Sequence, residues 1–465
     1  MENKRAQWSS KIGFILAAAG SAVGLGNIWK FPGRAYEGGG GTYLLVYLLV
    51  VVFLGIPLMM TELSLGRAGQ SNVVGTFRAL GHKRWSWVGW VGVLGAFIIT
   101  CYYSHVGGWV LRYVAGYLVD GKLIFADAPG YFYEMLGLHA DGTTSFPWAA
   151  VVFAAVFMAL NVLVIVRGVS GGIERFNKIG MPALLVLLVV LLFRSLTLPG
   201  AEEGLRYMLH FDLSALSFET LLSALGQAFY SLSIGMAIMI TYGSYLPRTE
   251  HIARNSVIIC LMDTLVAMIS GFIIVPAVFA TLGADQIGKG GGFAFVSLAG
   301  VFEKMPGGRW FALLFYLLLL FAALTSCVSL IEGIVAFLTE RFGWQRRRAT
   351  VGVSVVLFLI GCLYTCSQAA FPIKGLWLDA SGVSTPAFCD AMEYLTDRLM
   401  IPVCALGSCI FAGWVWKPAN VIEEVERCGT PFRLRRIYSV LVKFVAPIAI
   451  LTILVMSLVS GRTLS

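Results

Sequence analysis

The sequence predicts an all-α protein that crosses a membrane many times. Hydrophobic residues make up 58% of the chain and charged residues 13%, and the mean hydropathy is +0.82. Soluble domains are about 45–50% apolar and about 25% charged. Apolar runs long enough to cross a bilayer as a helix recur along the whole chain. The first run follows a short charged segment and lacks a small-residue cleavage site, so we expect no removable signal peptide.

The hydropathy pattern predicts eleven spans, at residues 12–36, 42–70, 87–119, 148–166, 179–198, 223–246, 256–282, 310–340, 350–366, 386–416 and 438–459. Segments on the N-terminal side of these spans hold 21 lysines and arginines, and those on the opposite side hold 9. Basic residues concentrate in cytoplasmic loops. We therefore expect a multi-pass cell-membrane protein with its N-terminus in the cytoplasm and its C-terminus outside. The same loops account for the net charge of +9 without a nucleic-acid partner.

The first span is interrupted near its middle. Gly20, Gly24 and Gly26 fall within seven residues and are followed by Asn27 and Lys30. A mid-helix glycine costs about 0.8–1 kcal/mol relative to alanine, and a lysine at membrane depth about 2.5–3.5 kcal/mol. A simple anchor needs neither, so the pattern favours a broken helix whose backbone carbonyls face a buried polar site. The alternative is a small-residue helix-packing pair formed by Gly20 and Gly24.

The predicted sixth span is interrupted as well, by Ser231, Ser233 and Gly235. Spans one and six are five apart, and paired interruptions at corresponding places are typical of an inverted repeat. We therefore expect a five-plus-five arrangement, with the first repeat at 1–200, the second at 201–418, and a final loop and span at 419–465.

The polar groups inside the spans are rich in oxygen. Asp263 lies deep in the seventh span, where an ionised carboxylate needs a cation or strong hydrogen-bond donors. Asn27, Ser231, Thr325 and Ser326 add amide and hydroxyl oxygens, without histidine or thiol. Hard cations bind oxygen, and with few carboxylates a monovalent ion fits best. For Thr325 and Ser326, the alternative is a hydrogen bond back to the carbonyl one turn earlier.

Apolar and aromatic residues of the spans suggest a substrate pocket beside this set, formed by Ile99, Tyr103, Tyr230, Met236 and Leu330. The positive N-terminal ends of half-helices would suit a substrate carboxylate. For these five residues the alternative is ordinary packing, in the core or against lipid.

Several motifs resemble the neurotransmitter:sodium symporter family. The run Gly20–Asn27 followed by Trp29-Lys30-Phe31-Pro32 is similar to its first-span signature. Further agreement comes from Gly55-Ile56-Pro57-Leu58, Tyr102-Tyr103, Gln227–Ser233 and Ala322–Ser326. The resemblance covers the chain from Trp8 through the tenth span. It implies a bacterial amino-acid transporter with the LeuT-type fold, in which spans one and six are discontinuous.

The resemblance also implies two sodium sites and no organic cofactor. The first site would use Ala22, Asn27, Ser231, Asp263 and the substrate carboxylate. The second would use carbonyls of Gly20, Val23 and Ala322 with the hydroxyls of Thr325 and Ser326. The implied substrate site comprises Ala22, Leu25, Gly26, Ile99, Tyr103, Tyr230, Ser231, Ser233, Met236, Ser326 and Leu330. The outer gate would pair Lys30 with Glu393, and the inner gate would pair Arg5 with Glu340, beside Trp8 and Tyr242.

The pocket and Asp263 define the expected function further. None of Ser233, Met236 and Leu330 offers a fixed charge, which suggests a neutral hydrophobic L-amino acid, aliphatic or aromatic. Asp263 stands where many family members have asparagine, and its charge is expected to replace the chloride that animal members need. We therefore expect a sodium-coupled symporter that imports such amino acids by alternating access, without enzymatic activity.

Three other classes compare less well with this pattern. A passive channel would carry like polar residues along a continuous path, whereas here they gather at mid-depth. An intramembrane hydrolase could use a metal motif or two aspartates, but no His-Glu-x-x-His occurs and only Asp263 lies deep in a span. A transporter-like sensor that binds the substrate remains the alternative.

Overall fold

The computed structural model describes residues 6–283, 287, 292–368 and 388–459, and the regular structure in these residues is helical apart from one isolated bridge. Nine segments of this part of the chain are long and apolar enough to cross a membrane. They are α3–η2–α4 (Gly41–Gly69), η3–α6 (Lys83–Val119), α9 (Trp148–Ile165), η4–α10 (Val169–Leu196), α14 (Ile252–Thr281), α16 (Gly308–Phe342), α17 (Arg346–Gln368), α18–η7–α19–η8 (Phe388–Val415) and α21–η9–α22 (Arg435–Leu458). The η labels mark π-helical or 3₁₀-helical segments.

Two further spans are broken. The first consists of α1 (Lys11–Ala22) and η1–α2 (Gly26–Glu37), which meet at an angle of 53°. The other consists of α12 (Phe218–Ser231) and α13 (Ile238–Gly243), at the place of the predicted sixth span. The all-helical fold with discontinuous spans one and six is therefore confirmed.

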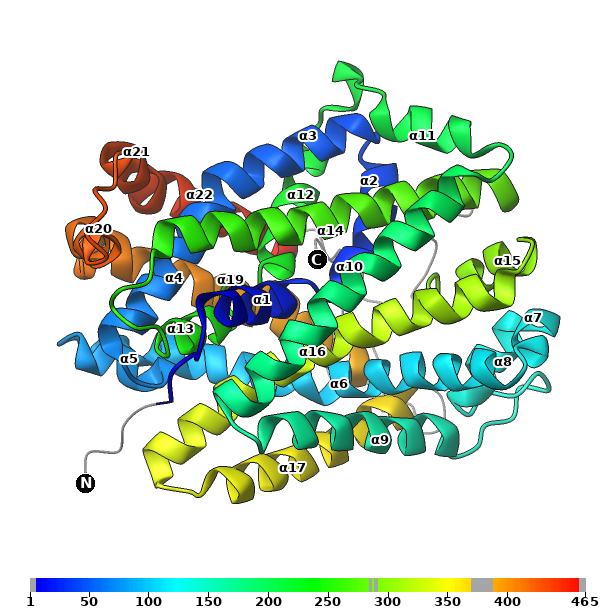
Figure 1. The fold of residues 1–465 in the computed structure, drawn as a ribbon, viewed down its shortest axis with the longest axis horizontal. Helices are drawn as coiled ribbons and strands as arrows, with labels where there is room; N and C mark the ends of the chain where they lie inside the picture. The colour runs from blue at the N-terminus through cyan, green and yellow to red at the C-terminus, as the bar shows by residue number, and fades with distance from the viewer. Residues whose placement is uncertain (1–5, 284–286, 288–291, 369–387, 460–465) are drawn as a thin grey trace.

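Short helices cover the two ends of the bundle (Figure 1). On the left of that view, called here the N-terminal side, lie α5 (Val73–Ala79) and α20 (Pro418–Glu426). On the opposite side lie α7 (Lys122–Ala126), α8 (Ala128–Met135), α11 (Ala201–Leu209) and α15 (Ser297–Glu303). In the interior α6 packs against α16, and α1 packs against α10, α14 and α16. The first half of the broken first span is thus flanked by three long helices.

The fifth span begins about ten residues earlier than predicted, at Val169 instead of 179. The early part contains Glu174, Arg175 and Lys178, which lower its mean hydropathy. The hydropathy pattern therefore placed the start of the span too late. The structure buries Glu174 fully and gives its carboxylate an ion pair with Lys178 at 2.8 Å. Pairing of this kind lets a charged turn continue an apolar span.

Candidate functional site

The break in the first span is stabilised by the side chain of Asn27, a residue of the same span. After α1 ends at Ala22, Val23 has an extended backbone (φ −67°, ψ 101°). The amide of Gly24 then donates to Asn27 Oδ1 at 3.1 Å, which satisfies one donor that the broken helix leaves free. A Cβ at Gly24 would lie 3.0 Å from Ser326 Oγ, so glycine allows the close approach of α16.

The break in the sixth span spans residues 232–237. Ser233, Gly235 and Ala237 have positive φ values of 54°, 77° and 64°. Two buried contacts hold this strained segment. Ser233 Oγ donates to the carbonyl of Ser21 in the first span at 3.0 Å, and Gly235 N donates to Glu62 Oε1 at 2.9 Å. Sequence reasoning assigned no role to Glu62, because its partner is a backbone amide 173 residues away.

Asn27, Ser231 and Asp263 meet in one buried cluster between the two breaks. Asn27 Nδ2 donates to Asp263 Oδ1 at 2.7 Å and to Ser231 Oγ at 2.8 Å. Ser231 Oγ donates to the other carboxylate oxygen, Asp263 Oδ2, at 2.7 Å. All three residues are at most 1% exposed. The three side chains that the resemblance assigns to the first ion site therefore lie together, with oxygens suited to a hard cation.

The second predicted set also lies together, at the C-terminal end of α1. Ser326 Oγ lies 3.4 Å from the Gly20 carbonyl and 3.2 Å from the Val23 carbonyl. Thr325 Oγ1 instead donates back within α16, to the carbonyls of Phe321 at 3.0 Å and Ala322 at 3.1 Å. The back-bonding alternative thus holds for Thr325, while Ser326 joins α16 to the first break.

A cavity lies between these two clusters. Its lining contains all eleven residues of the predicted substrate site, together with Ser21, Gly24, Asn27 and Ile238. Tyr103 OH accepts a 3.4 Å hydrogen bond from the amide of Leu25, which ties α6 to the first break. Gln227, which was part of the span-six motif but not of the predicted site, donates to the Gly26 carbonyl at 3.2 Å. One part of the wall is polar backbone and hydroxyl, and another is apolar side chains.

A vestibule of about 740 Å³ on the opposite side adjoins the cavity, and Leu25, Gly26, Tyr103 and Tyr230 line both. Such a vestibule gives the cavity a route to one side of the protein.

The predicted outer pair is corrected by the structure. Lys30 Nζ lies 3.6 Å from Asp397 Oδ2 and 4.5 Å from the centre of the Tyr230 ring. Glu393, the predicted partner, accepts a hydrogen bond from Tyr364 OH at 2.9 Å. Asp397 lies four residues beyond Glu393 on the same face of the helix, one turn further along it. Both carboxylates line the vestibule, but the ion pair forms with Asp397.

The N-terminal side is closed by aromatic packing. Trp8 Nε1 donates to the Tyr242 carbonyl at 3.1 Å, and the two rings lie edge to face at 5.1 Å. Arg5 lies outside the described residues, so its predicted pairing with Glu340 stays a prediction. Glu340 itself accepts hydrogen bonds from Asn72 N at 2.6 Å and Asn72 Nδ2 at 3.0 Å.

A second contact on this side was missed by sequence reasoning. The Glu174 carboxylate accepts hydrogen bonds from the hydroxyls of Ser9 and Ser10, both at 2.7 Å, and from the Ser9 amide at 2.7 Å. These hydrogen bonds connect the chain before α1 to the start of the fifth span.

Comparison with known proteins places the chain in a family. Residues 5–122 and 124–465 match the model of the sodium:neurotransmitter symporter family. A sodium-dependent transporter of Bacillus subtilis, YhdH, is 35% identical over 456 residues, which cover 97% of each chain. A sodium-dependent transporter of Haemophilus influenzae is 33% identical and covers 98% of this chain and 99% of its own.

A solved structure agrees with these matches. The crystal structure of MhsT in complex with L-phenylalanine has a TM-score of 0.84 and 36% identity, and covers 97% of this chain and 99% of that chain. The family and the fold are those of membrane transporters and not of enzymes. The chain belongs to the sodium:neurotransmitter symporter family and has the LeuT-type fold.

Proposed function

We propose that this sodium-dependent transporter imports neutral hydrophobic L-amino acids, with its N-terminal side in the cytoplasm and two Na⁺ sites. The observation that carries the proposal is the cavity itself, in which two helix breaks, oxygen clusters and an apolar wall meet. The bound L-phenylalanine of MhsT supports the same substrate class, because that protein is 36% identical to this chain.

The cavity lining has the groups that an amino acid needs. The backbone of Leu25 and Gly26 lies at the start of the half-helix η1, whose positive end suits the substrate carboxylate. Tyr103 OH, which already accepts from Leu25 N, can donate to the same carboxylate. Ile99, Met236 and Leu330 supply the apolar wall for a side chain without charge.

The two oxygen clusters suit two sodium ions. At the first cluster Asp263 supplies a fixed negative charge within 2.7 Å of both Asn27 and Ser231. This charge offsets part of the charge of two cations in a site of low dielectric, so we propose that transport does not need chloride. At the second cluster Ser326 brings its hydroxyl to the carbonyls of the first break, and the neighbouring Thr325 hydroxyl lies at the Ala322 carbonyl of α16.

Alternating access requires that the cavity open to one side at a time. In this structure the vestibule adjoins the cavity on the opposite side, while Trp8, Tyr242 and Glu174 close the N-terminal side. These N-terminal contacts must part when the substrate leaves toward the cytoplasm. We therefore expect these contacts to break during each transport cycle.

The proposal is tested by uptake of radiolabelled leucine, phenylalanine and tryptophan into proteoliposomes. We expect accumulation with an inward Na⁺ gradient and none with K⁺ on both sides, and the ratio of the labels ranks the substrates. Accumulation that does not depend on Na⁺ would contradict the coupling. Saturable Na⁺-dependent binding without accumulation would favour the sensor over the symporter.

Chloride independence has a separate test. Replacing chloride by gluconate on both sides of the membrane should leave Na⁺-driven uptake unchanged, because Asp263 carries the negative charge. Uptake that falls in gluconate would remove Asp263 from this role and leave the substrate proposal standing.

A further inference from the structure

Another cleft lies on the N-terminal side and shares no lining residue with the substrate cavity. It has a volume of about 350 Å³ and is lined by Gly413, Trp414, Lys417, Pro418, Ala419, Ser439 and Lys443. The lining comes from the end of the tenth span (η8), the start of α20 and the start of the last span (α21–η9). Two of its seven residues are lysines, and none is acidic.

The acidic residues near this cleft already have partners. Residues 417–443 contain three glutamates, and each pairs with arginine: Glu424 with Arg67 at 2.7 Å and Arg427 at 3.0 Å, Glu423 with Arg427 at 3.9 Å, and Glu426 with Arg435 at 2.6 Å. The Phe432 amide and Arg435 hold the pKa of Glu426 below its usual range. Within the described residues neither Lys417 nor Lys443 forms an ion pair, so the cleft keeps its positive charge.

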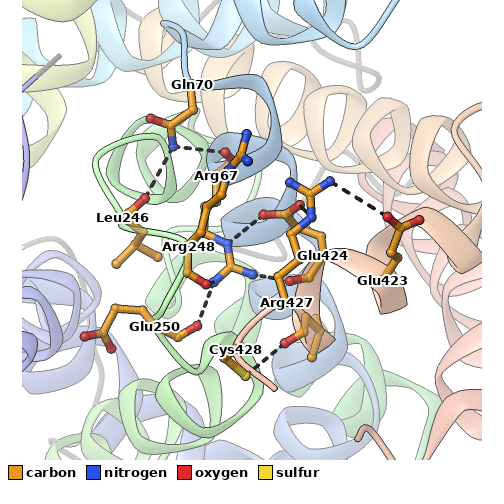
Figure 2. Close-up of polar contacts among 10 residues, drawn as sticks. Arg67, Gln70, Leu246, Arg248, Glu250, Glu423, Glu424, Arg427 and Cys428 are labelled. Atoms are coloured by element: carbon orange, nitrogen blue, oxygen red, sulfur yellow. Dashed lines mark hydrogen bonds and ion pairs between the residues drawn. The ribbon is translucent and has the colours of Figure 1, made fainter. Parts of the chain in front are cut away.

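The helix α20, which begins directly after Lys417, is anchored by a buried ion pair between its Glu424 and Arg67 (Figure 2). Buried Arg67, from the end of α4, also donates to the Glu250 carbonyl at 2.6 Å and to the carbonyl of Glu424. This network joins α4, the loop after α13 and α20. A buried ion pair of this kind fixes geometry, because loss of one partner leaves an uncompensated charge. The start of α20 is therefore held in place beside the last span.

The surface around the cleft is built to face lipid. Trp414 is 55% exposed, and its ring lies edge to face with Phe444 at 5.4 Å. Ile437 and Val440, between them and the start of the span, are also exposed. The Trp414 indole donates to the Lys443 carbonyl at 3.0 Å, and Lys443 Nζ lies 5.7 Å from the ring centre. Exposed apolar residues with an interfacial tryptophan and a long lysine are typical of the headgroup level of a bilayer.

The backbone at Lys417 gives a further indication. Lys417 has φ 74° and ψ 141°, a region where glycine is unstrained and lysine is not. A lysine at this position is thus disfavoured by its own backbone, while its side chain lines a cationic cleft at the lipid boundary. Folding alone does not explain a lysine at this position, so its positive charge points to a role in binding.

We propose that this cleft binds the phosphate of an anionic phospholipid, with Lys417 and Lys443 as the cationic contacts and Trp414 beside the glycerol and upper acyl region. The partner is a lipid and not free phosphate, because the cleft opens beside exposed apolar residues that an acyl chain can cover. Basic residues near a membrane surface favour anionic lipid by about fivefold each.

The test is native mass spectrometry of the full chain, released from an equimolar mixture of phosphatidylglycerol and phosphatidylcholine. We expect the wild type to retain phosphatidylglycerol preferentially. In the double variant Lys417→Gln with Lys443→Gln this preference should fall about 25-fold, from about fivefold for each lysine. Equal retention by the double variant and the wild type would overturn the proposal.

Two further variants separate lipid binding from folding. Glycine fits the positive φ of this position, so the melting temperature of Lys417→Gly should equal or exceed that of the wild type. Its preference for phosphatidylglycerol should fall about fivefold. Lys83→Gln removes an exposed lysine of η3 on the same side and should change neither property. Loss of preference in Lys83→Gln as large as in Lys417→Gly would mean general attraction to a basic surface and overturn the site. Displacement of the lipid by inorganic phosphate at equal concentration would overturn the lipid as its partner.

Discussion

Replacing Asp263 by asparagine should weaken Na⁺ binding strongly while it keeps the shape of the side chain. The carboxylate accepts hydrogen bonds of 2.7 Å from both Asn27 Nδ2 and Ser231 Oγ in a fully buried site. Contacts to a charged group contribute about 1.5–3 kcal/mol, and those between neutral groups about 0.5–1.5 kcal/mol. Neutralising a ligand that contacts the ion thus removes about 1–1.5 kcal/mol per contact, which corresponds to about 5- to 12-fold in Na⁺ affinity for one contact.

The assay is the Na⁺ concentration dependence of radiolabelled leucine binding to purified protein. For Asp263→Asn we expect the half-saturating Na⁺ concentration to rise by this factor, and added chloride to restore part of the loss by supplying the missing charge. Thr264→Val is the matched control, since it changes the next residue of α14 and its buried hydroxyl has no hydrogen-bond partner among the described residues. Unchanged Na⁺ dependence in a folded Asp263→Asn variant would refute the reasoning.

Three other perturbations follow from the same geometry. Thr325→Val combined with Ser326→Ala should abolish the second ion site and reduce the cooperativity of Na⁺ activation of uptake; wild-type activation would reject that site. Asp397→Asn should speed substrate dissociation more than Glu393→Gln does, but by no more than about fivefold, because a partly exposed ion pair contributes about 1 kcal/mol or less. The opposite order in a dissociation assay would favour the predicted pair over the observed one. Arg67→Ala removes the fully buried partner of Glu424 and leaves Arg427 as the arginine paired with it, so it should cost about 1.5–3 kcal/mol, seen as a lower melting temperature of the solubilised protein; an unchanged melting temperature would show that Arg67 does not contribute to stability.

The sequence was most informative where it departs from a plain apolar helix. Gly24 and Asn27 in the first span, and Ser233 and Gly235 in the sixth, each cost free energy in a continuous membrane helix. Such residues are tolerated where neighbouring groups satisfy the backbone, and the structure shows both spans broken at these points. Local chemistry was therefore sufficient to locate the breaks.

Contacts between distant helices required the structure. Glu393 and Asp397 lie one turn apart on one face, and η7 (Tyr394–Met400) is π-helical, which changes the register. A sequence pattern identifies the face but not which carboxylate lies level with Lys30. Glu174 was similarly obscured, because its partners Ser9 and Ser10 are more than 160 residues away and its charge looked like the end of a span.

The two breaks are each held by a carboxylate from the other half of the chain. Asp263, on the span that follows the sixth, binds the Asn27 side chain of the first break. Glu62, on the span that follows the first, accepts from the Gly235 amide of the sixth break. An inverted repeat of five spans would place the second and seventh spans in equivalent positions, so this exchange supports the proposed repeat more directly than hydropathy does. The two carboxylates then differ in use: Glu62 binds backbone, which fixes its break, whereas Asp263 binds side chains that a cation can share. A carboxylate from the other half of the chain thus contacts each break, and we propose that the one at the first break, Asp263, also takes part in ion binding.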